Sequence, residues 1–237
     1  ANLSAIAPGG TYNWYDAAAG GTLLHTGANF MTQVLTINTT YYVETVNAAG
    51  IASPRTQVDV TVNPIPTAPV VPVTPVCAGN NITLTPNDQT GTFEWYDAAT
   101  GGNLLAKTNA YTTPALTVNQ TYYVQQTING CTSPMTQVDV TVSPLPSVTS
   151  TSSGSICSGN ALNYTMTSDI AAVTFSWNRA AVTGISNPAV ANQTTNTITE
   201  ILNNTSANAV DVKYIITPIN NGCPGTPFTY TVTVYPT

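Results

Sequence analysis

The chain has 237 residues, of which 42% are hydrophobic and only 6% are charged, and its formal net charge is −6. Four Lys and Arg residues cannot build the basic patch that displaces counterions from phosphate, which argues against a nucleic-acid partner. The hydrophobic fraction argues against disorder, and no apolar run approaches the roughly 20 residues that a membrane helix needs. No basic segment followed by an apolar core marks a signal peptide.

A segment near the N-terminus occurs a second time about 80 residues later. Residues 12–66 align with residues 93–146 across a single one-residue deletion, and more than half of the aligned positions are identical. This period exceeds that of solenoid repeats and matches one small domain per repeat. The sequence therefore predicts three domains, which we call repeat 1 (1–66), repeat 2 (67–146) and domain 3 (147–237).

Repeat 1 begins partway through its domain. Leu3 aligns with Leu84, so the residues equivalent to Val76–Gly79 would lie before Ala1. We therefore expect repeat 1 to be N-terminally incomplete and the 237 residues to be a piece of a longer polypeptide.

Prolines mark the domain boundaries. The segment Pro64–Pro75 carries five prolines in twelve residues, which favours either a semi-rigid extended spacer or an edge strand that enters repeat 2. The segment Ser143–Ser147 is shorter and should bend less.

Short alternating runs predict strands throughout, with no helical periodicity. The Ala98–Gly102 segment should form a turn, and Asn129–Gly130 a hairpin. The predicted strands are 81–86, 92–97, 116–118, 121–128 and 136–142 in repeat 2, and 173–177, 210–217 and 228–234 in domain 3. This pattern predicts an all-β chain of tandem β-sandwich domains, which the proline linkers should hold in an extended row.

The aromatic residues divide between two faces of the strands. Buried core positions are predicted for Trp14, Trp95, Trp177, Tyr41 and Tyr122. Tyr15 and Tyr96 alternate with tryptophans and should point outward, where a sugar ring or a partner could stack. They are the candidate ligand-stacking residues, although single exposed tyrosines are also common on sheets.

The four cysteines occupy matching places in two domains. Cys77 and Cys157 open repeat 2 and domain 3, and Cys131 and Cys223 lie in the last hairpins. Three pairings are possible, and we predict the pairs 77–131 and 157–223, since they need no exchange between domains. Each bond would stabilise its domain by about 4 kcal/mol in the chain-entropy account and implies an extracytoplasmic protein.

The sequence predicts no catalytic, cofactor-binding or metal-binding residue. Zinc would need CxxC pairs, which are absent, and His25, expected to be a solvated loop residue, is the only histidine. The ten acidic residues are scattered, and Asp97 should cap the turn that follows it rather than bind calcium. Lys213 alternates with Val212 and Tyr214 and should face outward, away from any isopeptide partner.

Four motifs of repeat 2 carry a family resemblance: 76–84 (VCAGNNITL), 93–102 (FEWYDAATGG), 121–124 (TYYV) and 129–134 (NGCTSP). They resemble the Ig-like repeats of large surface proteins of gliding bacteria that use the type IX secretion pathway. In domain 3, residues 156–160, 175–177 and 214–223 resemble the PKD-like modules that accompany these repeats. The resemblance implies a very large cell-surface adhesin, with the mobile SprB type used in gliding as one candidate.

From these features we expect a non-catalytic stalk segment of an extracellular, cell-surface adhesin, without cofactors and monomeric in isolation. Its partners would be neighbouring repeats of the same long chain and a surface polysaccharide or other adhesion ligand. The alternative hypothesis is a carbohydrate-binding or accessory module of a secreted polysaccharide-degrading enzyme, since such modules also serve there as spacers.

Overall fold

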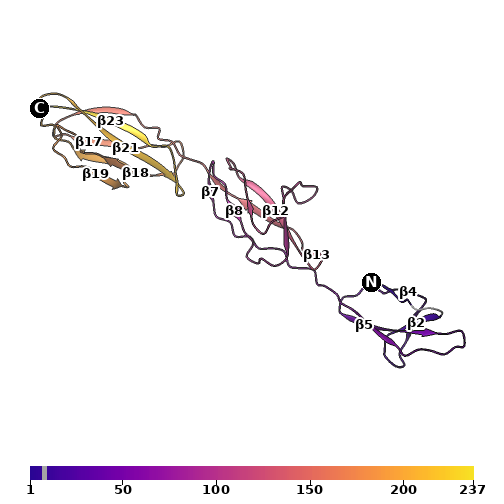
Figure 1. Ribbon diagram of the computed structural model, residues 1–237. Helices are drawn as coiled ribbons and strands as arrows, with labels where there is room; N and C mark the ends of the chain where they lie inside the picture. The colour runs from indigo at the N-terminus through magenta and orange to yellow at the C-terminus, as the bar shows by residue number, and fades with distance from the viewer. Residues whose placement is uncertain (7–9) are drawn as a thin grey trace. The chain divides into compact units, whose positions relative to one another are not determined.

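The computed structural model describes residues 1–6 and 10–237, and these contain only strands and irregular segments (Figure 1). The prediction of an all-β chain of tandem sandwich domains is confirmed. The chain forms two compact units: unit 1 comprises residues 1–66 and 128–132, and unit 2 comprises residues 67–127 and 133–237. Each of the segments 1–66, 67–146 and 147–237 carries its own cluster of buried residues.

Repeat 1 packs two antiparallel sheets around a small core. Its strands are β1 (Asn2–Ser4), β2 (Thr11–Tyr15), β3 (Leu23–Thr26), β4 (Asn29–Met31), β5 (Thr39–Val46) and β6 (Thr56–Val60). One sheet has the order β3-β2-β5-β6, and β1 pairs with β4 in the other. Among the described residues of repeat 1, the buried cluster consists of Trp14, Phe30 and Tyr41.

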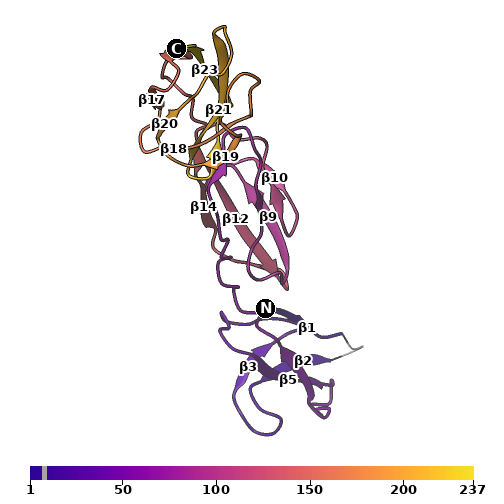
Figure 2. The ribbon, with the colours of Figure 1, turned by 90° about the vertical axis from the view of Figure 1, so that its left-hand side faces the viewer.

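Repeat 2 has the same framework with a larger core. Its strands are β7 (Val76–Cys77), β8 (Thr83–Leu84), β9 (Thr92–Tyr96), β10 (Leu104–Ala106), β11 (Tyr111–Thr112), β12 (Gln120–Ile128), β13 (Cys131–Thr132), β14 (Thr136–Val140) and β15 (Val142–Ser143). The main sheet joins β10, β9, β12 and β13, and β14 also pairs with β12 (Figure 2). The opening strand β7 pairs in parallel with the closing strand β15.

In domain 3 the first and last strands also pair in parallel, and its longest strand has eleven residues. Its strands are β16 (Ser153–Cys157), β17 (Ala161–Thr165), β18 (Thr174–Arg179), β19 (Val190–Gln193), β20 (Thr197–Ile201), β21 (Val210–Asn220), β22 (Cys223–Pro224) and β23 (Phe228–Tyr235). The main sheet has the order β16-β23-β21-β18-β19, with β22 also paired to β21. The opening strand β16 pairs in parallel with the closing strand β23.

Alternation along the strands places the cores as predicted. Trp14 and Trp95 are 1% and 0% exposed, and Trp177, Tyr41 and Tyr122 are also buried. Lys213 is exposed between buried Val212 and Tyr214, as its phase in β21 requires. The apolar face of each strand therefore fixes its register against the core.

The proline-rich segment is part of repeat 2 rather than a free spacer. The carbonyl oxygen of Thr67 accepts a hydrogen bond from Gln126 Nε2 at 2.9 Å, and that of Pro69 accepts one from Thr136 Oγ1. Val71 and Val73 pack against the repeat 2 core. The extended conformation that proline favours thus lets this segment pack against the core of repeat 2 without pairing as a strand of the sheet.

Two local predictions differ from the structure, and two short strands of repeat 2 were not predicted. Residues 116–118 contribute only an isolated bridge at Leu116, not a strand. His25 lies in β3, half-buried, with its ring stacked on Phe30 at a centroid distance of 5.5 Å, so its prediction as a solvated loop residue is wrong. The short strands β10 and β11 were not predicted, because two or three residues cannot show a period-2 pattern.

The turn after β9 forms as predicted. The Asp97 carboxylate accepts hydrogen bonds from the Asn103 backbone N–H at 2.6 Å and from Asn103 Nδ2 at 2.8 Å. These bonds lower the pKa of Asp97. A Cβ on Gly102 would lie 2.6 Å from the Ala98 carbonyl oxygen, so the turn needs glycine there. Asp16 closes the equivalent turn of repeat 1 through the Thr22 N–H at 2.7 Å.

Two neighbouring substitutions test the assignment of faces. Trp95→Ala should destabilise repeat 2 by about 3–5 kcal/mol, because it opens a cavity in the core and removes the hydrogen bond from Trp95 Nε1 to the Thr108 carbonyl. Tyr96→Ala should cost less than about 1 kcal/mol, as for a surface side chain. Hydrogen exchange of the β12 amides measures both, and equal losses of protection would contradict the assignment.

Candidate functional site

No conventional reaction centre is found in the part of the chain that the structure describes. Among residues 1–6 and 10–237, no three His, Cys, Asp or Glu side chains are grouped to hold a metal ion. No helix long and apolar enough to cross a membrane was found among the residues searched. The notable features are a disulfide, two tyrosine surfaces and one buried ion pair.

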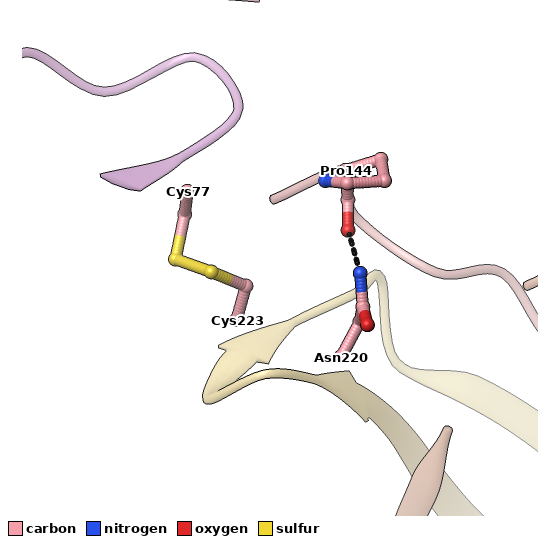
Figure 3. Close-up of a disulfide and its surroundings, with 4 residues drawn as sticks. All are labelled: Cys77, Pro144, Asn220 and Cys223. Atoms are coloured by element: carbon pink, nitrogen blue, oxygen red, sulfur yellow. Dashed lines mark hydrogen bonds between the residues drawn. A yellow bond between two sulfur atoms is a disulfide. The ribbon is translucent and has the colours of Figure 1, made fainter. Parts of the chain in front are cut away.

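The disulfide joins the opening strand of repeat 2 to domain 3. Cys77 lies in β7, and its parallel pairing with Ser143 in β15 places it beside the end of its own domain. Cys223 lies in β22, at the turn that follows β21. The two cysteines are bonded, with a Cα–Cα distance of 5.5 Å and a sequence separation of 146 (Figure 3).

The predicted pairs 77–131 and 157–223 are therefore wrong, and Cys131 and Cys157 are free thiols. Strand geometry explains the error. Cys77 lies near the start of the nine-residue β12, whereas Cys131 follows its end, about 27 Å away at ~3.4 Å per residue. Cys157 and Cys223 lie at opposite ends of the eleven-residue β21, about 34 Å apart. Disulfides need Cα atoms within about 7 Å.

Further contacts close the same junction. Asn220 Nδ2 donates a hydrogen bond to the Pro144 carbonyl oxygen at 2.9 Å (Figure 3). A Cβ on Gly225 would collide with the Pro146 carbonyl oxygen, so the backbone approaches closely there. The segment between repeat 2 and domain 3 is thus held by a covalent bond, a hydrogen bond and direct backbone contact.

Tyr15 lies half-buried on the outer face of repeat 1, and its ring is covered. The Arg55 guanidinium lies 3.4 Å above the ring centroid, and Glu44 accepts a hydrogen bond from the Tyr15 hydroxyl at 2.9 Å. Arg55 also pairs with Glu44 at 3.1 Å and donates to the carbonyl oxygens of Ala17 and Gly20. A ligand stacking on this face of Tyr15 would have to displace Arg55.

Tyr96, the equivalent residue of repeat 2, has different neighbours, because Met135 replaces the arginine. Its hydroxyl donates to Glu94 at 2.8 Å, and Glu94 pairs with Lys107 at 2.7 Å. The hydrogen bond from Lys107, with those from Tyr96 and Gln125, lowers the pKa of Glu94 from its ordinary 4.5 to about 2. The stacking role of Tyr15 and Tyr96 stays a prediction.

Sequence reasoning missed a buried ion pair in domain 3. Arg179 is 1% exposed and forms a two-pronged pair with Glu200 at 2.9 and 3.0 Å. The Tyr214 hydroxyl also donates to Glu200. Burial raises the pKa of Glu200, but the hydrogen bonds from Arg179 and Tyr214 outweigh it and leave the pKa lowered. The sequence feature that could have identified it is alternation in β18, because Phe175 and Trp177 point inward and Arg179 is the next residue on the same face.

The family models account for nearly all of the chain. The model of the CHU_C-associated Ig-like domain matches residues 1–64 and 66–144, and that of the PKD-like domain matches residues 154–237. The chain therefore belongs to the CHU_C-associated Ig-like domain family and carries a PKD-like domain, which confirms the resemblance to these two kinds of repeat. No curated protein matches the sequence.

The chain also has a distant similarity to several solved structures. The fibronectin(III)-like modules of Clostridium thermocellum CbhA are 13% identical over 70% of this chain and 94% of that one, with a TM-score of 0.36. Extracellular domains 3–5 of Drosophila OTK are 10% identical over 100% of this chain and 91% of that one, with a TM-score of 0.40. Domains FN1–FN3 of chicken CNTN1 are 11% identical over 95% and 91%, with a TM-score of 0.37.

Ig-like and PKD-like domains are generally non-catalytic and are common in adhesion and extracellular proteins. Together with the disulfide, the family matches support a structural or adhesion module of an extracellular protein.

The buried and the exposed ion pair should respond differently to the same substitution. Glu200→Gln leaves the Arg179 charge buried without its counter-ion and should destabilise domain 3 by about 3 kcal/mol. The matched control, Glu94→Gln, removes a pair whose lysine is 65% exposed and should cost less than about 1 kcal/mol. Hydrogen exchange of the β21 and β12 amides reports on each domain separately.

The pH dependence should follow the same pairs. The folded-state pKa values of Glu94 and Glu200 are lowered, so their contributions are present above about pH 4.5 and are lost as the pH falls through the lowered pKa, which is about 2 for Glu94. Glu200→Gln should flatten the acid-induced loss of β21 protection. An unchanged acid profile would show that Arg179 and Glu200 do not govern the stability of domain 3.

Proposed function

We propose that this chain is a non-catalytic spacer segment of a large bacterial cell-surface adhesin, and that its domains resist tension while another part of the protein makes the adhesive contact. The resemblance of its motifs to type IX-secreted repeats supports a parent used for surface attachment and gliding. The proposed partners are neighbouring repeats of the same long chain.

The observation that carries this proposal is the Cys77–Cys223 bond, which closes a covalent loop of 146 residues around most of repeat 2 and domain 3. A pull applied to both ends of the chain passes through the bond between two Cα atoms 5.5 Å apart. The residues inside the loop cannot be stretched while the bond is intact. Such an arrangement suits a stalk and gives no advantage to a module that only binds a sugar.

Single-molecule pulling tests the mechanical part. Under oxidising conditions, residues inside the loop should add nothing to the extension. After reduction, or in Cys77→Ser, they should add about 500 Å, at ~3.4 Å for each of 146 residues. Cys131→Ser with Cys157→Ser is the matched control and should behave as the unaltered chain. Extension of the residues inside the loop without reductant would contradict the proposal.

A glycan screen tests the division between spacer and binding module. We expect no saturable binding of soluble or surface polysaccharides to the whole chain. Specific binding that is lost in Tyr96→Ala, and retained in the matched variant Tyr235→Ala, would instead favour the carbohydrate-binding alternative. Tyr235 is an exposed tyrosine of β23 in domain 3, outside the sheet that carries Tyr96, so it controls for the loss of an exposed tyrosine.

A further inference from the structure

We propose that repeat 1 carries an acceptor site for an extended Pro- and Val-rich segment with the chemistry of Thr67–Cys77, whose cysteine forms a disulfide with Cys131. The occupant is thus a peptide segment that covers one face of repeat 1 and ends beside the hairpin of residues 128–132. The site is inferred from the contacts of repeats 1 and 2 and does not depend on the proposed mechanical function.

Repeat 2 shows how such a segment is held. Thr67–Val73 lies over β12 and β14, where Gln126 and Thr136 donate hydrogen bonds to the backbone carbonyls of Thr67 and Pro69. Val71 and Val73 pack onto the core below. Under this cover, Val124, Val138 and Val140 are at most 2% exposed.

The same face of repeat 1 is hollow. A groove of about 350 Å³ is lined by residues that include Tyr12, Trp14, Val43, Thr45, Thr56 and Val58. These align with Phe93, Trp95, Val124, Gln126, Thr136 and Val138, which form the covered face of repeat 2. Val43, Val58 and Val60 are only half-buried, unlike their repeat 2 equivalents. The groove therefore has an apolar floor like the one that Val71 and Val73 cover in repeat 2. It also has the hydroxyl of Thr56, which is equivalent to the Thr136 hydroxyl that donates to Pro69.

The end of repeat 1 has the local geometry of the closing strand of repeat 2. The Val62 N–H donates to Asn38 Oδ1 at 2.8 Å, as the Val142 N–H donates to Asn119 Oδ1 at 2.8 Å. In repeat 2, the residue after Val142 pairs with Cys77. A segment that paired with residues 62–63 in the same way would bring its cysteine to Asn63.

Cys131 already lies at that position. Its Sγ is 3.6 Å from the Asn63 carbonyl oxygen, and Asn63 Nδ2 donates to the Asn129 carbonyl oxygen at 3.1 Å. Cys223 holds the equivalent place in the hairpin of domain 3, and it is bonded to Cys77. A cysteine at this place in a hairpin is thus bonded to the opening segment of the preceding domain in one case, and the free thiol of Cys131 is placed to form the same bond in the other.

The bond can form by two thiol–disulfide exchanges with a small disulfide such as oxidised glutathione. The Cys131 thiolate attacks one sulfur of glutathione disulfide and releases one reduced glutathione. The thiolate of the incoming segment then attacks the mixed disulfide at the Cys131 sulfur and releases the second. Two thiols are oxidised, one disulfide is reduced to two thiols, and the two protons pass to the released glutathione.

A peptide with the sequence of Thr67–Asn80 tests the site on the whole chain. Its cysteine is activated as a mixed disulfide with 5-thio-2-nitrobenzoate, which leaves when a protein thiolate attacks the peptide sulfur. We expect Cys131, which is half-buried, to be modified at least tenfold faster than the exposed Cys157. A peptide of scrambled sequence, identically activated, should prefer Cys157. Equal preferences for the two peptides would overturn the proposal.

A matched pair of variants tests the groove. Thr56→Val removes the proposed donor to the peptide backbone and should slow modification of Cys131 severalfold. Thr26→Val alters an exposed threonine of β3 outside the groove and should leave the rate unchanged. Attachment of the peptide should also protect the β5 and β6 amides of repeat 1 from hydrogen exchange. Modification of Cys131 without this protection would show that the thiol is reactive but that the groove takes no segment, and the proposal would be wrong.

Discussion

The parallel pairing of the first and last strands of a domain is the constraint on which the rest of this structure depends. In repeat 2, β7 pairs in parallel with β15, so the opening segment runs along the domain in the same direction as the closing strand and brings Cys77 to the end where the chain leaves the domain. The opening cysteine consequently lies beside the following domain. The hairpin cysteine lies at the other end, because a nine-residue strand separates the two. Repeat 2 therefore offers its two cysteines to two different ends of the domain.

This constraint also explains which features could be predicted from the sequence. Period-2 alternation places Trp95 inward and Tyr96 outward, and a repeated turn motif predicts the hydrogen bonds of Asp97, because both depend on residues close together in the chain. The pairing of the cysteines depends on which ends of the strands lie next to each other. That depends on the parallel pairing of β7 with β15, which the alternation of residues within each strand does not predict. Matching positions of the cysteines in repeat 2 and domain 3 favour bonds within each domain, whereas the structure joins Cys77 of one domain to Cys223 of the next.

The buried ion pair of domain 3 illustrates a second limit. Arg179 follows two inward aromatic residues in β18, so strict alternation would have placed it in the core, but a charged residue is normally assigned to the surface. The structure resolves the conflict with a partner, since Glu200 and the carbonyl oxygens of Ala180 and Pro188 accept hydrogen bonds from the guanidinium. The partner comes from β20, across the sandwich, and nothing in the local sequence identifies it.

Because the chain has few charged residues, the disulfide is an important part of what holds repeat 2 to domain 3. With 6% charged residues, the surfaces offer few ion pairs to fix one domain against the next, and surface pairs contribute little in any case. A bond that closes a loop of 146 residues restricts the unfolded chain by about 5 kcal/mol in the chain-entropy account, and it needs no large interface. Because that bond connects an opening strand to a hairpin of the next domain, every additional domain of this design can be joined by the same two cysteines. A repeated pair of half-sites therefore suits a chain that grows by duplication, since each new copy brings one half of the junction before it and one half of the junction after it.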